Sequence, residues 1–156
     1  MENLRVTVGR VVDFDDQSKQ PDAILKLNDT NAYLVSKKDP RFEVWARMIK
    51  ERRTQQGLLY VEFQLPMYRV TKILLPSLRR IESVALQPEG TRVKVVIFMA
   101  PSLYFINSAR TGFRELRRVL EESTRTNTDL FLSIDPDSLE ILDARSADVS
   151  GAIKVP

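Results

Sequence analysis

Two stretches of the chain, 39–53 and 110–122, carry apolar residues at the same helical spacing. The matching residues are Phe42, Trp45, Met48 and Ile49 in the first stretch, and Phe113, Leu116, Val119 and Leu120 in the second, each pair 71 positions apart. Apolar residues three or four positions apart lie on one face of a helix, so both stretches predict a helix packed on a core. The same spacing predicts that Trp45 is a core residue rather than an exposed stacking platform. Asp39 and Pro40 suit the start of the first helix, and Gly57 suits its end.

Alternating apolar and polar residues predict strands on both sides of each helix. The predicted strands are 5–14, 23–27, 32–36, 58–63 and 68–74 around the first helix, and 81–86, 93–99, 103–107, 130–134 and 139–144 around the second. Gly9, in the middle of the first strand, predicts a bulge or a sharp bend. The fold class is therefore mainly β with two helices, an α+β protein.

The element order β-β-β-α-β-β occurs twice, which predicts an internal duplication. We expect a first unit at 1–76, a second unit at 77–148 and a frayed tail at 149–156, with the two units joined near residues 76–80. The order, the bent first strand and the position of the helix resemble the OB fold, a small Greek-key barrel. The resemblance covers Val6 to Leu74 and Ile81 to Ala144, although the second unit lacks a glycine where Gly9 would map. One pseudo-symmetric merged sheet packed by two helices has the same list of elements.

Composition removes several kinds of chemistry. The chain has no cysteine and no histidine, so disulfides, thiol chemistry and the commonest general base and metal ligand are excluded. It also lacks a glycine-rich nucleotide motif. Asp13, Asp15 and Asp16 cluster at the end of the first strand and could bind a divalent cation, but their spacing is not that of an EF-hand and favours a solvated loop. We expect no catalysis, no cofactor and no metal site. With no long apolar run and no signal-peptide pattern at the start, we expect a cytoplasmic protein with no membrane partner.

The formal net charge is only +3, but the charges are unevenly distributed. OB-like barrels often hold single-stranded nucleic acid on a basic, aromatic face, so the resemblance implies this as an alternative function. The candidate cations are Arg47, Lys50, Arg52, Arg53, Arg69, Lys72, Arg79 and Arg80, and the candidate stacking rings are Tyr33, Tyr60, Tyr68 and Tyr104. The same residues are also expected if the charged side chains are simply solvated and the tyrosines are half-buried residues of strands.

The turns between the last two strands of each unit differ in polarity. Residues 135–138 are Asp-Pro-Asp-Ser, as expected of an exposed turn, whereas Leu65, Pro66, Met67 and Tyr68 are mostly apolar. An exposed apolar tip lowers solubility unless something covers it. We therefore predict that Leu65, Met67 and Tyr68 contact the second unit or a partner. The preferred function is a non-catalytic binding or assembly module that docks a protein partner or its own copy.

Overall fold

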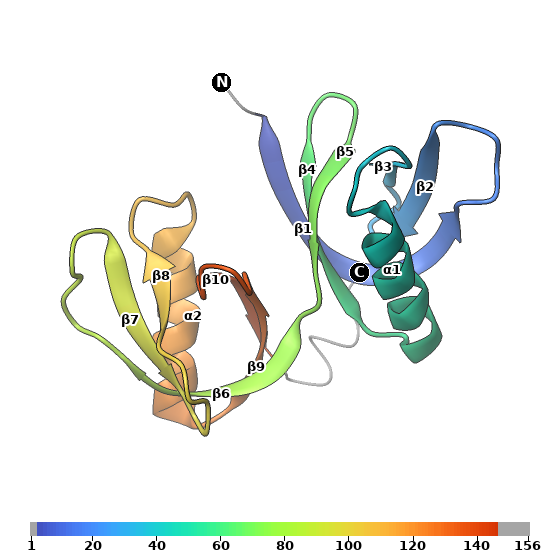
Figure 1. Ribbon diagram of the computed structural model, residues 1–156. Coiled ribbons are helices and arrows are strands. Elements are labelled where there is room, and N and C mark those ends of the chain that lie inside the picture. The colour runs from blue at the N-terminus through green and yellow to red at the C-terminus, as the bar shows by residue number, and fades with distance from the viewer. Residues whose placement is uncertain (1–2, 147–156) are drawn as a thin grey trace. The chain divides into compact units, whose positions relative to one another are not determined.

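The computed structural model describes residues 3–146 (Figure 1). They form two compact units, and the boundary between the units along the chain lies between Leu75 and Pro76. The protein is mainly β with two helices, as predicted. Each unit has the element order β-β-β-α-β-β. The predicted frayed tail, 149–156, lies outside the described residues.

Unit 1 is a closed barrel of five strands with the neighbour order β1-β2-β3-β5-β4. Its elements are β1 (Leu4–Asp15), β2 (Asp22–Leu27), β3 (Ala32–Ser36), α1 (Phe42–Gln55), β4 (Leu58–Gln64) and β5 (Arg69–Leu74). All strand pairs are antiparallel except β3 and β5, which pair in parallel at Leu34 and Arg69. Trp45, Ala46 and Ile49 of α1 pack into the core of this barrel. The prediction that Trp45 is a core residue is therefore confirmed.

The long strand β1 changes its partner near the bend predicted at Gly9. Its first half pairs with β4 as far as Arg10, and its second half pairs with β2 from Val11. The turn after β2 packs beside this part of β1, where Asn28 N–H donates to Arg10 O and Arg10 N–H donates to Asn28 Oδ1, both at 3.1 Å. A Cβ at Gly9 would lie 2.6 Å from Asn28 Oδ1, so a larger residue at this position would displace the Asn28 side chain.

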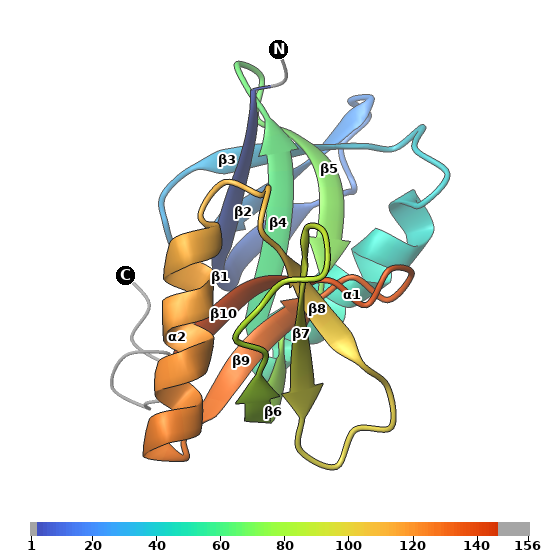
Figure 2. The same cartoon turned by 90° about the vertical axis from the view of Figure 1, so that its left-hand side faces the viewer.

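Unit 2 is an antiparallel sheet with the order β10-β9-β6-β7-β8, and its helix packs on that sheet (Figure 2). Its elements are β6 (Ser77–Val84), β7 (Arg92–Ile97), β8 (Tyr104–Asn107), α2 (Phe113–Thr126), β9 (Asp129–Ile134) and β10 (Ile141–Ser146). The edge strands approach each other only at an isolated parallel bridge between Phe105 and Glu140. Apolar residues from all five strands and Leu120 of α2 form a separate core.

The two units repeat the same backbone details at a spacing of 71 residues. Leu34 N–H donates to Tyr68 O in unit 1, and Phe105 N–H donates to Leu139 O in unit 2. Both acceptor residues have a positive φ, 59° for Tyr68 and 66° for Leu139. The residues that cap the C-termini of α1 and α2, Gln56 and Asn127, are also both left-handed. The helical stripe and the strand ends that match in the sequence therefore match in the backbone as well.

Three sequence expectations need correction. Each sheet takes strands from one half of the chain only, so the merged sheet is not formed. Residues 77–80 are not a linker: they are the first half of β6 and pair with β9. The exposed positions of this segment carry both apolar and charged side chains, so the alternation of apolar and polar residues that predicts a strand is not visible in the sequence. Asp39 does not cap α1, since Arg41 is the N-cap residue and the Asp39 carboxylate accepts the Arg41 N–H at 2.8 Å.

Candidate functional site

The apolar turn predicted as an interaction site, 65–68, is largely part of unit 1. Leu65 and Tyr68 are half-buried and pack against the core of unit 1. The ring of Tyr68 stacks on Phe63 with 5.3 Å between centroids. Pro66 and Met67 are exposed, with 60% of Met67 accessible. The barrel itself thus covers two of the three residues that we expected the second unit or a partner to cover, and only Met67 projects into solvent.

The predicted basic residues are dispersed, and several are neutralised by carboxylates. Lys50 of α1 pairs with Asp16 at 2.7 Å, Arg53 with Asp13 at 3.5 Å and Arg69 with Asp22 at 3.0 Å. The Lys50 ammonium hydrogen-bonds Asp16 and lowers the pKa of that carboxyl below its ordinary value. Of the remaining residues, Arg47 is exposed on α1, and Arg52 on α1 and Lys72 on β5 are half-buried. Arg79 and Arg80 lie on β6 of unit 2, where Arg80 pairs with Asp129 at 2.9 Å.

The four tyrosines do not form an exposed stacking face. Tyr33 and Tyr60 are fully buried, and Tyr68 and Tyr104 are half-buried against the cores of their own units. The Tyr33 hydroxyl donates to Asp29 Oδ2, and burial together with this carboxylate raises the pKa of Tyr33 to about 12. The ring positions therefore agree with the packing interpretation, which treated these tyrosines as half-buried strand residues.

Two of the three aspartates at the end of β1 pair with cations of the protein. Asp13 and Asp16 pair with Arg53 and Lys50, which ties the end of β1 and the following loop to α1. Within residues 3–146, no three acidic side chains gather in a way that could hold a metal ion.

Three exposed large apolar side chains lie together in the loop between β7 and β8, residues 98–103, which we name the apolar loop. Met99 is 86% accessible, Leu103 61% and Phe98 54%. The loop is ordered at its base, because Phe98 N–H donates to Arg80 O at 2.8 Å and Ala100 N–H donates to Ile97 O at 3.1 Å. In Figure 2 it projects past the ends of its two strands. Three large apolar side chains are thus held in water by a defined turn.

The corresponding loop of unit 1 shows that the fold does not need this composition. Residues 28–31, between β2 and β3, are Asn-Asp-Thr-Asn, and Thr30 supplies the left-handed residue with φ 70°. In the longer apolar loop the left-handed residue is Met99 with φ 60°, two residues after the end of β7, whereas Thr30 lies three residues after the end of β2. A left-handed backbone costs a residue with a Cβ roughly 1–2 kcal/mol, and glycine or asparagine tolerates it better. Met99 is therefore unfavourable in both conformation and exposure.

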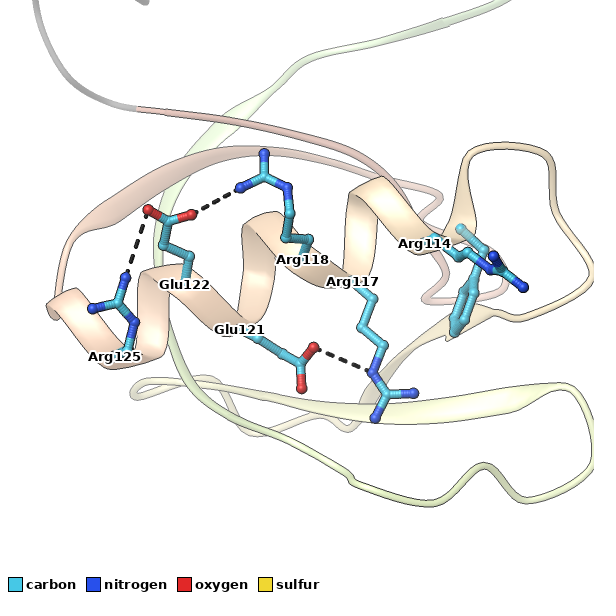
Figure 3. Close-up of a pocket in the computed structure, with 7 residues that line it drawn as sticks. Arg114, Arg117, Arg118, Glu121, Glu122 and Arg125 are labelled. Atoms are coloured by element: carbon cyan, nitrogen blue, oxygen red, sulfur yellow. Dashed lines mark hydrogen bonds and ion pairs between the residues drawn. The ribbon is translucent and has the colours of Figure 1, made fainter.

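A shallow hollow on the exposed face of α2 is lined mainly by arginine and glutamate (Figure 3). Arg118 pairs with Glu115 at 2.6 Å and with Glu122 at 2.9 Å, and Arg117 pairs with Glu121 at 3.4 Å. Arg117 also donates to the carbonyl oxygens of Ala85 and Leu86. These pairs are three or four residues apart and stabilise the helix itself. The arrangement is that of a solvated helix face and presents no converging cationic site.

The sequence reasoning missed the apolar loop because it continued a strand through Phe98 and Met99. The apolar run ending at Met99 suggested strand 93–99, but β7 ends at Ile97, where the chain turns. The available signal was the comparison between units: aligning residues 28–31 with 98–103 pairs a polar loop with an apolar one.

Among the described residues, no helix is long and apolar enough to cross a membrane. Comparisons with protein-family models, with curated proteins and with solved structures yielded no significant match.

Proposed function

We propose that the protein is a non-catalytic docking module that binds a protein surface through the apolar loop of unit 2. The observation that carries this proposal is the pairing of two equivalent loops, of which one is polar and the other exposes Phe98, Met99 and Leu103. Methionine and aromatic residues are enriched at the centres of protein interfaces, where they exclude water. The proposed partner surface is a concave apolar site that receives the loop.

We further propose that both units have an OB-like arrangement, a closed barrel in unit 1 and an open sheet in unit 2, that arose by internal duplication. The strand order of unit 1, with its parallel β3–β5 pair, supports the barrel assignment. The hydrogen bonds and left-handed residues repeated at a spacing of 71 support the duplication. Under this proposal, unit 1 retains a polar turn at the β2–β3 position and unit 2 has acquired an apolar one, so the two units have different roles.

Binding of single-stranded nucleic acid is less well supported. The proposed stacking rings are buried or half-buried, and Lys50, Arg53, Arg69 and Arg80 are paired with aspartates. Such binding needs exposed rings beside cations that are free to neutralise phosphates.

Site-specific photo-cross-linking of the full chain tests the docking role. A photo-reactive phenylalanine analogue placed at Met99 is expected to give a discrete protein adduct in cells. The same analogue placed at Thr30, the left-handed residue of the polar loop, provides the matched control and is expected to give none. Adding Phe98→Ser and Leu103→Ser to the Met99 probe should abolish its adduct, because these residues supply the rest of the apolar contact.

The outcomes separate the alternatives. A protein adduct that depends on Phe98 and Leu103 supports docking, whether the partner is another protein or a second copy. A nucleic-acid adduct from position 99 would instead support the nucleic-acid alternative and reject the proposal. Equal labelling from positions 99 and 30, or none from either, would also reject it. Unchanged thermal unfolding of each variant would show that the loop residues are not needed for folding.

A further inference from the structure

Methionine supplies all the sulfur in this chain, which has no cysteine. The methionines in the described part of the chain differ in exposure: Met99 is 86% accessible and Met67 is 60% accessible, whereas Met48 is half-buried against the core of unit 1. The single tryptophan, another side chain that oxidants attack, is buried. A peroxide must reach a thioether sulfur to oxidise it, so Met99 is the most accessible target among these methionines.

The backbone of the apolar loop holds the Met99 side chain away from the fold. On one side of it, Phe98 N–H donates to Arg80 O at 2.8 Å. On the other side, Ala100 N–H donates to Ile97 O at 3.1 Å. Between these two anchored residues, Met99 takes its left-handed conformation. Its side chain belongs neither to the core of unit 2 nor to the partly buried residues packed on that core. Oxidation of its sulfur therefore needs no opening of the fold and disturbs no core contact.

We propose that Met99 is a modification site at which a peroxide switches docking off, by converting the thioether of the apolar loop to a sulfoxide. This rests on the proposed docking function and adds its regulation. In the reaction with hydrogen peroxide, the O–O bond breaks as one oxygen bonds to the sulfur. The sulfur is oxidised by two electrons, and the other oxygen leaves as water. Methionine sulfoxide reductases reverse the change, so the site can be reset.

The sulfoxide weakens docking while the free protein keeps its fold. In the free protein, water hydrates the sulfoxide oxygen of the exposed side chain. Docking buries position 99 in an apolar contact, so this oxygen loses its water without gaining a hydrogen-bond partner. We expect oxidation to weaken docking by roughly tenfold or more. The partner in turn covers the sulfur, so Met99 should be oxidised more slowly in the docked protein.

Limited oxidation of the purified full chain tests the reactivity of the site. Hydrogen peroxide is added, and peptide mapping by mass spectrometry follows the sulfoxide at each methionine over time. Met99 should react first, Met67 more slowly and Met48 slowest of the three. Met67 is the matched control, because it is an exposed methionine in a turn outside the apolar loop. Oxidation of Met67 or Met48 ahead of Met99 would overturn the inference.

Photo-cross-linking by the oxidised chain tests the effect on docking. The photo-reactive analogue is placed at Leu103, which leaves Met99 intact, and Met67→Leu removes the other exposed methionine of the described residues. The chain is oxidised, freed of peroxide and added to an extract of the cells in which the Met99 probe gives its adduct, so the partner itself is not oxidised. The adduct of the untreated chain should decrease about tenfold on oxidation. It should return after treatment with the two methionine sulfoxide reductases, one for each sulfoxide epimer.

The outcomes separate the switch from the docking function. An adduct that survives complete oxidation of Met99 would overturn this inference and leave the docking function standing. No adduct from the untreated chain would reject the docking function, and the switch with it. A loss of adduct that the reductases do not reverse, or that accompanies a lower melting temperature, would place the damage elsewhere in the chain and would also overturn the inference.

Discussion

At the residue scale, the Asn28 side chain in the turn after β2 lies close to Gly9 of β1. Gly9→Ala would place a methyl group on Asn28 Oδ1, which is held by the Arg10 N–H. Displacing this hydrogen bond should cost about 1–3 kcal/mol of the free energy of unfolding, measured by denaturant titration. In an Asn28→Ala background the same glycine change should cost much less, because the conflicting oxygen is absent. Equal costs in both backgrounds would mean that the backbone, not Asn28, requires glycine.

Tyr33 gives unit 1 a dependence on alkaline pH. Its native pKa is about 12 and its ordinary value is 10, because burial and the Asp29 carboxylate disfavour the phenolate. Below pH 10 both folded and unfolded chains hold this proton, so the full contribution to stability is present. Between pH 10 and 12 the unfolded chain loses the proton first, so the free energy of unfolding should fall. Tyr33→Phe should be less stable at pH 8 and show a smaller decrease over this range; an unchanged slope would contradict the assignment.

At the scale of elements, the two helices have the same length and spacing but are buried to different extents. Trp45 is 4% accessible and has the Arg41 guanidinium 4.4 Å from its ring centroid. Its counterpart Leu116 is only half-buried. Trp45→Ala should therefore destabilise unit 1 by about 3–5 kcal/mol, measured by circular dichroism during denaturant unfolding. Leu116→Ala, the matched change in α2, should cost clearly less; similar losses would show that the two stripes are equally important.

At the scale of the whole molecule, each unit has its own core, and the single tryptophan lies in unit 1. Tryptophan fluorescence therefore reports on unit 1, while circular dichroism reports on both units. Leu59→Ala and Leu130→Ala remove equivalent buried side chains and should each cost about 2–5 kcal/mol. We expect Leu59→Ala to shift the fluorescence transition and Leu130→Ala to shift only the dichroism transition. A fluorescence shift in Leu130→Ala would show that the units unfold as one cooperative body.

The sequence alone determined the features that follow from periodicity. The 3.6-residue stripe of Phe42, Trp45 and Ile49 and the alternation along the strands were enough to predict two helices, the order of helices and strands along the chain and a core position for Trp45. Gly9 predicted a bulge or a sharp bend, but the register irregularity of β1 lies between Val11 and Asp13, and Gly9 lies where the Asn28 side chain approaches the strand. These features are local, because a helix or strand that is buried on one side has apolar residues at the spacing of that side.

Tertiary structure decided which apolar residues remain exposed. Leu65 and Met99 are similar residues near turns, yet the barrel of unit 1 covers Leu65 while Met99 lies in water. It also decided which charges are free, since Lys50 and Asp16 come together only when α1 packs beside the end of β1. Exposure and pairing arise from contacts between distant segments, and hydrophobic periodicity carries no information about which distant segments meet.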